Sequence, residues 1–339
     1  MVVKSIPNHL LEQCLVLFRA LSLYSVESES YMFPNIVRSK QNELVVVAPY
    51  SISREKFEKA LDGLGSIFGR KFIGLEDLGN HRWLLQEYKL PELVPYSSRP
   101  ANIPVEDYWL GTYEDGSPVV LRFEHSPVLL VAGASGSGKT ELFKVLLREI
   151  EQAWGSDVIT IAEGAKAGND FRHQPCKKLV TETDEVLAVY EHMLSLYEKR
   201  KQLIKKLDVD NWLQAREKGV EWRPHYFLID ECPLFLSAPK KGDDDFNERT
   251  RIIKIASHLA ARGRYVGLFQ ILGTQDPSST GLPSDIMNQV RLKIGYSMRT
   301  AEMSRAYFGQ ASAHAADLVR GKGIAMLGSE PRIFRGALN

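Results

Sequence analysis

Short apolar runs alternate with longer amphipathic stretches over the last two thirds of the chain. The apolar runs predict buried strands at 128–132, 158–161, 226–229, 266–272 and 292–296. The amphipathic stretches predict helices at 140–152, 185–207 and 248–261. Strands that alternate with helices of this length are typical of a parallel α/β sheet. Two later runs, 324–327 and 332–334, predict edge strands.

The first hundred residues have a different pattern, in which short helices and strands alternate without long amphipathic stretches. This pattern predicts a small α+β domain. In order, we expect a helix capped by Asn8, a strand at 44–47, a helix that begins at Ser53 and is ended by Gly65, and a strand at 82–88.

A proline-rich segment separates these two patterns. Four prolines lie from Pro91 to Pro104, with two serines between them, and such a composition is typical of a linker. We therefore expect two domains, with residues 1–100 forming the small α+β domain and residues 101–339 forming the larger α/β domain.

Composition excludes several classes of protein. Of the 339 residues, 44% are apolar and 25% are charged, which is globular and excludes a disordered or fibrous chain. No apolar run reaches 18 residues, and the N-terminus has no secretory pattern. The three cysteines are widely spaced without a CxxC pair, which argues against disulfides and structural zinc. We expect a cytoplasmic protein.

The charge is unevenly distributed along the chain. Residues 249–339 contain 13 Lys and Arg but only five Asp and Glu, and ten of the 13 are arginines, whereas the rest of the chain is acidic. Arginine binds phosphate through fixed planar donors, so this pattern indicates contact with a polyanion. A solvated charged face is the alternative interpretation.

A glycine-rich loop matches the phosphate-binding pattern GxxxxGK[ST]. It reads Gly133-Ala134-Ser135-Gly136-Ser137-Gly138-Lys139-Thr140. The loop follows a predicted strand and precedes a predicted amphipathic helix, as phosphate binding at a helix N-terminus requires. We expect the loop to hold the phosphates of ATP, with Lys139 reaching the β- and γ-phosphates and the Thr140 hydroxyl holding Mg²⁺.

Two carboxylates and one amide follow buried strands and complete this pattern. Asp230 and Glu231 end the apolar run 226–229, about 90 residues after the phosphate loop. We expect Asp230 to orient the Mg²⁺ shell and Glu231 to act as the general base toward water. Gln275 ends the strand at 266–272, beside the carboxylate strand. It is a candidate for sensing the γ-phosphate and for signalling to the loop at 276–282.

These stretches resemble the FtsK/SpoIIIE motor domains of the HerA–FtsK class of ring ATPases. The similarity covers residues 106–339 well and extends loosely back to Ser51. The similar stretches are GTYEDGSPVVLRFEHSPVLLVAGASGSGKT (111–140), PHYFLIDE (224–231), LAARGRYVGLFQILGTQDP (259–277), STGLPSDIMNQVRLKIGYSM (279–298) and GKGIAML (321–327).

The resemblance implies a RecA-like P-loop NTPase core that forms a homo-hexameric ring and pulls double-stranded DNA by hydrolysing ATP. In such rings an arginine of one subunit completes the neighbour's site. Arg264 matches the family's arginine ahead of the sensor strand, and Arg262 and Arg291 are further candidates. The family's ATQRP motif has an acid at position 276 here, so no phosphate or DNA contact is carried over to that loop.

The family contains several kinds of motor, and alternatives follow from that. The compact chain resembles translocases of plasmids, integrative elements or phages, which implies DNA transfer or segregation and a partner that loads DNA or forms a membrane channel. A secretion or genome-packaging ATPase of the same class would move protein or a viral genome instead. A nucleotide-switched scaffold is the third alternative.

Overall fold

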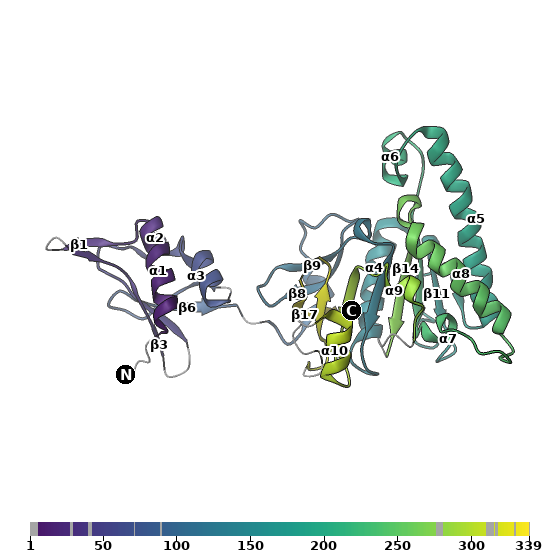
Figure 1. The fold of residues 1–339 in the computed structure, drawn as a ribbon. Coiled ribbons are helices and arrows are strands. Elements are labelled where there is room, and N and C mark those ends of the chain that lie inside the picture. Colours follow the sequence, from purple (N-terminus) through teal and green to yellow (C-terminus); the bar gives the residue numbers. More distant parts are fainter. Residues whose placement is uncertain are drawn as a thin grey trace. The chain divides into compact units, whose positions relative to one another are not determined.

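The protein divides into two compact units. The computed structural model describes residues 6–27, 30–39, 43–70, 72–88, 90–275, 281–309, 315, 318–328 and 330–338. Residues 1–90 together with 114–117 form the first unit, and residues 91–113 with 118–339 form the second (Figure 1). The division falls at Pro91, the first proline of the segment that predicted the domain boundary.

The first unit is the predicted α+β module. Its four-stranded sheet is antiparallel with the order β3-β4-β6-β5, and β1 pairs with β2 in a separate hairpin. Phe18, Phe57 and Trp83 form the centre of its core. The elements are α1 (Asn8–Ala20), β1 (Ser25–Glu27), β2 (Ser30–Met32), β3 (Asn35–Arg38), β4 (Leu44–Val47), α2 (Arg54–Glu58), α3 (Leu61–Phe68), β5 (Phe72–Asp77) and β6 (Arg82–Glu87).

Two helix boundaries in this unit differ from the prediction. Ser53 caps α2 as expected, but the predicted single helix is two helices, and the second continues through Gly65. It ends at Gly69, which takes the left-handed backbone conformation that stops a helix, with φ of +62°. Asn8 is the first residue of α1 rather than its cap, because Pro7 occupies the cap position.

The second unit is built on a large mixed sheet. The described residues form eleven strands in the order β12-β11-β13-β14-β10-β15-β16-β17-β8-β9, with β7 paired to β17. The pairings from β12 to β15 are parallel and those from β15 to β9 are antiparallel. The strands are β7 (Val94–Pro95), β8 (Tyr108–Tyr113), β9 (Pro118–Leu121), β10 (Val128–Ala132), β11 (Ile159–Glu163), β12 (Lys178–Val180), β13 (His225–Asp230), β14 (Leu268–Thr274), β15 (Leu292–Gly295), β16 (Lys322–Met326) and β17 (Arg332–Leu338).

Helices cover both faces of this sheet. The connections from β10 to β11 and on to β12 run in one direction along the sheet, and those from β12 to β13 and from β13 to β14 run back. Right-handed crossovers therefore put α4 on one face and α5 and α8 on the other (Figure 1). The helices are α4 (Lys139–Trp154), α5 (Thr183–Leu207), α6 (Trp212–Glu217), α7 (Pro233–Leu236), α8 (Phe246–Arg262), α9 (Ser284–Met287) and α10 (Ala301–Phe308). None of the described helices combines the length and apolar character needed to cross a bilayer.

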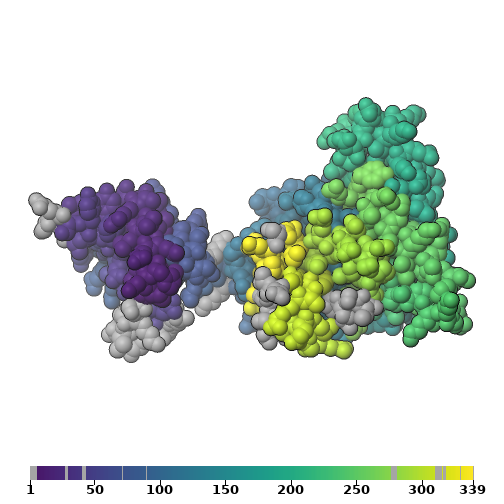
Figure 2. All heavy atoms as spheres, viewed as in Figure 1, coloured from purple at the N-terminus to yellow at the C-terminus, as the bar shows by residue number. Residues whose placement is uncertain are grey.

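The predicted parallel α/β core is confirmed, but the prediction of two terminal edge strands is wrong. Strands β16 and β17 lie inside the sheet, because the hairpin of β8 and β9 adds two strands beyond β17. The C-terminal residues, which are yellow in Figure 2, appear on the face of the second unit that is turned to the viewer.

The proline-rich segment is packed within the second unit. Its short strand β7 pairs with β17, and Tyr96 and Arg99 contact helix α4. The buried carboxylate of Glu149 accepts hydrogen bonds from the Tyr96 hydroxyl, from Arg99 Nε at 2.9 and 3.1 Å, and from the Trp109 amide at 2.7 Å. The guanidinium of Arg148 lies over the Tyr96 ring. We call residues 94–103 the strap.

Removal of the Glu149 carboxylate should destabilise the second unit. Glu149→Ala leaves three donors without their common acceptor, two of them buried, so we expect the free energy of unfolding to fall by about 3 kcal/mol. Glu151→Gln on the exposed side of the same helix is the control, with an expected change within about 0.5 kcal/mol. Urea unfolding measures both variants, and equal effects would contradict the role of Glu149.

Candidate functional site

The predicted phosphate loop joins β10 to α4. Gly136 has φ of +76° and Gly138 has φ of +122°, conformations that residues with side chains rarely adopt. Helix α4 begins at Lys139, and no side chain caps its N-terminus. The first amide groups and the positive end of the 16-residue helix therefore point into the loop, which is the geometry of an anion site.

Buried polar groups of the loop fit a phosphate. The Ser137 hydroxyl is shielded from solvent and has no hydrogen-bond partner among the described residues. Lys139 is 7% exposed, and its Nζ donates to the carbonyls of Gly133 and Ala134. Thr140 follows in the first turn of α4. The donors offered by the loop match the oxygen acceptors of a phosphate group.

The carboxylate strand lies two strands from the phosphate loop. Strand β14 lies between β13 and β10, and the ends of all three strands are in register. The amide of Gly133 donates to the Thr274 carbonyl at 3.1 Å. Gly273 of β14 lies between the two motifs. A Cβ at this position would lie only 3.2 Å from Asp230 Oδ1, so the absence of a side chain leaves room for the carboxylate. Asp230 is therefore about 10 Å across the sheet from the phosphate loop.

Electrostatic coupling links the two motifs. Burial lowers the pKa of Lys139, and the charges of Asp230 and Glu231 oppose this shift. Burial also raises the pKa of Asp230, which Lys139 partly offsets. The lysine and the carboxylates thus face one space at the carboxyl edge of the sheet.

Glu231 has a backbone conformation that is rare for its residue type. Its φ is +56°, in the left-handed region, and such strain occurs often at functional sites. Its Oε1 accepts a hydrogen bond from the main-chain N–H of Gln275 at 3.3 Å, so the predicted base lies beside the residue predicted to be the sensor. The adjacent Cys232 amide donates to the Gly273 carbonyl at 2.7 Å. Residues 276–280 of the predicted signalling loop lie outside the described residues.

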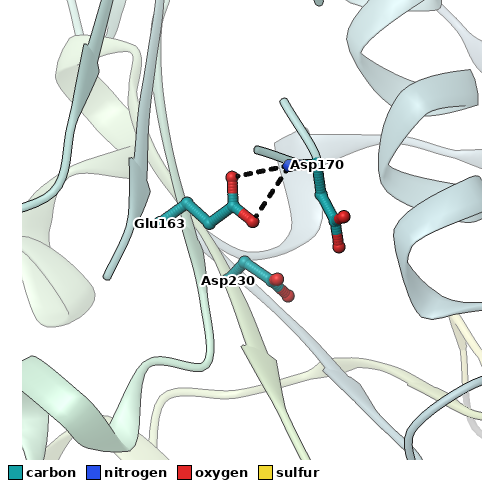
Figure 3. A group of neighbouring side chains, drawn as sticks. All are labelled: Glu163, Asp170 and Asp230. Carbon is teal, nitrogen blue, oxygen red and sulfur yellow. Dashed lines mark hydrogen bonds between the residues drawn. The ribbon is translucent and has the colours of Figure 1, made fainter. Parts of the chain in front are cut away.

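Two acidic residues that the sequence analysis did not select lie beside Asp230. Glu163 ends β11, directly opposite Asp230 in the parallel register. Its carboxylate accepts from the Asp170 amide at 3.3 and 3.2 Å (Figure 3). Carboxylate oxygens of Glu163, Asp170 and Asp230 lie within 4.8 Å of one another. A signal was available, because Glu163 lies two residues after the predicted buried strand at 158–161.

This donor set fits a hard divalent cation. Carboxylate and hydroxyl oxygens are ligand types that Mg²⁺ takes together with phosphate oxygens and water. Glu163 is fully buried, and burial raises the pKa of its carboxyl group. A cation at this site would offset the cost of keeping such a group charged.

Arg264 lies at the amino ends of the parallel strands, opposite the ends that carry the phosphate loop and the carboxylates. It is in the turn before β14, and its Nη1 donates to the Glu124 carbonyl at 3.0 Å. The seven residues of β14 separate this turn from Gln275, a distance of about 20 Å. Within one chain, Arg264 therefore cannot contact a ligand in the phosphate loop. It lines a cavity of about 650 Å³ whose other walls include Phe123 and Trp212.

Comparison with known proteins gives sequence relatives of one kind. No family model matches the chain. It is 25% identical to the DNA translocase FtsK of Haemophilus influenzae over 73% of its own length and 51% of that protein. It is 26% identical to FtsK of Treponema pallidum over 70% of its length and 30% of that protein. The chain thus spans 30% to 51% of the length of these relatives.

Solved structures share the fold. The pCW3 conjugation coupling protein TcpA, in its monomer form with ATPγS, has a TM-score of 0.66 at 19% identity, over 97% of this chain and 95% of that one. Thermomonospora curvata EccC (ATPases 2 and 3), in complex with a signal sequence peptide, has a TM-score of 0.56 at 16% identity over 74% and 44%. These relatives support an FtsK/SpoIIIE-type motor domain, and the fold is that of a P-loop NTPase core.

Proposed function

We propose that the chain is an ATPase that moves along double-stranded DNA and serves the transfer or segregation of a mobile element. The observation that carries this proposal is the alignment of three strand ends. It brings the phosphate loop, Gln275 and the Asp230–Glu231 pair to one edge of the sheet. The sequence relatives are DNA translocases, and the structure of a conjugation coupling protein shares nearly the whole fold. The basic C-terminal quarter supports a polyanion as cargo.

ATP is held by groups of the loop and of α4. The main-chain amides and the Ser137 hydroxyl donate to phosphate oxygens, and Lys139 exchanges its loop carbonyls for the β- and γ-phosphates. Thr140 and Asp230 would hold Mg²⁺, and Glu163 lies beside Asp230 on the neighbouring strand. When bound, Mg²⁺ neutralises phosphate charge that develops during cleavage.

Glu231 takes the proton of the attacking water. Its side chain lies at the end of β14, where the main-chain N–H of Gln275 donates to Oε1, and its backbone is in the left-handed region. A carboxylate held in this way is already oriented to accept a proton, which lowers the entropic cost of the transfer. Loss of the γ-phosphate changes the contacts of Gln275. Through this change the loop at 276–282 would respond to whether ATP or ADP is bound.

Duplex DNA should stimulate ATP hydrolysis by the full chain. DNA contacts of a translocating motor are made to phosphates, so affinity for duplex should fall by about 10³-fold or more between 50 and 200 mM salt. Lys139→Ala is the control that should abolish nucleotide binding and turnover. An ATP hydrolysis rate that is the same with and without duplex DNA would contradict the proposal that DNA is the cargo, and would favour a secretion motor. Full turnover in Glu231→Gln would favour a scaffold.

The strain at Glu231 gives a stability test of its role. A glycine adopts the left-handed conformation without steric cost, so Glu231→Gly should be about 0.5–1 kcal/mol more stable than Glu231→Ala. Both variants should lose hydrolysis because they lack the carboxylate. Urea unfolding of the two variants measures the difference. An alanine variant as stable as the glycine variant would show that the conformation carries no strain.

We infer that the motor is a homo-hexameric ring in which Arg264 acts on the neighbour's nucleotide, because it lies too far from the phosphate loop of its own chain. Arg264→Ala should retain ATP affinity and lose about 10³-fold in turnover. Mixing with Glu231→Gln subunits should restore hydrolysis, because the Glu231→Gln subunit supplies Arg264 to the neighbouring Arg264→Ala subunit, whose own Glu231 is intact. Arg251→Ala on α8 is the control that should keep turnover. Failure to recover at any mixing ratio would exclude action in trans.

Its location in the cytoplasm, and a partner that loads DNA or forms a membrane channel, stay predictions from the sequence.

A further inference from the structure

A second recess lies beside the phosphate loop. It is a cavity of about 220 Å³ between the first turn of α4 and the C-terminal strands. Gly138 and Glu141 line it on the side of α4, Tyr296 lines it after β15, and Arg335 lines it from β17. Its walls therefore combine main chain, a buried aromatic ring and charged side chains of both signs. The mechanism above uses none of the residues that β17 contributes.

Arg335 is the unusual group in this cavity. The residue is only 9% exposed, and its Nη1 donates to the Arg320 carbonyl at 2.7 Å. Its Nε is shielded from solvent and has no hydrogen-bond partner among the described residues. No carboxylate of the described residues forms an ion pair with the Arg335 guanidinium. A buried donor without an acceptor is costly, so such a group indicates a missing ligand.

Main-chain hydrogen bonds fix this wall to the phosphate loop. The Gly321 amide donates to the Ser137 carbonyl at 3.2 Å, and the Gly336 amide donates to the Gly321 carbonyl at 3.1 Å. Gly138 lies close to the same wall, since a Cβ there would be 3.4 Å from Tyr296 Cε1. Arg335 is therefore held at a set position relative to the loop.

The direction of the cavity identifies the part of the ligand that would enter it. The β- and γ-phosphates lie over the start of α4, where Lys139 and the loop amides converge. Glu141 and Leu142 follow Lys139 and Thr140 in the first turn of α4 and line the cavity, so the cavity adjoins the place where the loop would hold the phosphates. A guanidinium only donates hydrogen bonds, so its partner is an oxygen or ring nitrogen. Glu141 forms an ion pair with Lys144 at 3.0 Å, and Glu92 and Arg320 also line the cavity. Of the charged residues in this lining, Arg335 is the one with a buried donor that lacks an acceptor among the described residues.

We propose that this cavity receives the nucleoside part of ATP and that Arg335 donates a hydrogen bond to an acceptor of its sugar or base. The inference rests on the proposed ATP binding at the phosphate loop. It adds a binding residue that lies about 200 residues after the loop, on a strand outside the nucleotide-binding motifs. Arg335 thereby distinguishes a nucleotide from a bare polyphosphate.

The test compares two ligands that share the phosphates and differ in the nucleoside. Calorimetry measures the affinity of the full chain for ATP and for inorganic tripolyphosphate, both with Mg²⁺. Arg335→Gln should weaken ATP binding about 10-fold to 100-fold, as expected for a hydrogen bond from a charged donor. It should leave tripolyphosphate binding unchanged. Arg335→Lys keeps the charge and loses the fork, so an intermediate loss is expected.

Arg332→Gln is the matched control, because Arg332 lies on the same strand, is exposed and does not line the cavity. It should alter neither affinity. An unchanged ATP affinity in Arg335→Gln would overturn the inference, and so would an equal loss for both ligands, which indicates a phosphate contact or a damaged loop. If Arg335→Gln does not fold, Arg335→Lys is judged by the same two criteria. Absence of ATP binding by the unmodified chain would instead refute the proposed function.

Discussion

The parallel register of β10, β14 and β13 is the constraint on which the site depends. Each strand ends with a different chemical group, and parallel pairing brings all three groups to one edge. A slip of one residue in β14 would turn its side chains to the other face of the sheet. It would also move Gly273 away from Asp230, and any other residue there would contact the carboxylate and Phe143. The spacing of the motifs is thus set by hydrogen bonds of the sheet.

The C-terminal strands contribute a second constraint. The phosphate loop is bonded at Ser137 to Gly321, a residue more than 180 positions later in the chain. The loop is therefore held on one side by β14 through Gly133 and on the other by the turn before β16. A loop fixed from both sides keeps its amide groups oriented before a ligand arrives, which reduces the entropic cost of binding.

The sequence predicted the parts of the fold and site that are local in the chain. The strand at 128–132, the loop and the Asp230–Glu231 pair each carry their signal in a few consecutive residues. The misjudged features depend on distant partners. Strands β16 and β17 look like edges until the hairpin of β8 and β9 is added, and the unpartnered Nε of Arg335 is visible only when its surroundings are known. Glu163 had a local signal near a strand end, but only the pairing of β11 with β13 shows that it lies beside Asp230.

The strap shows why proline content alone is a poor guide to mobility. Prolines remove amide donors and favour extended backbone, but they do not prevent side chains from packing. Tyr96 and Arg99 converge on Glu149, which is ten residues, or about 15 Å, along α4 from Lys139. Helix α4 is therefore held near its middle by the strap and at its start by the phosphate loop. The proline-rich segment is therefore packed as part of the second unit rather than as a free linker.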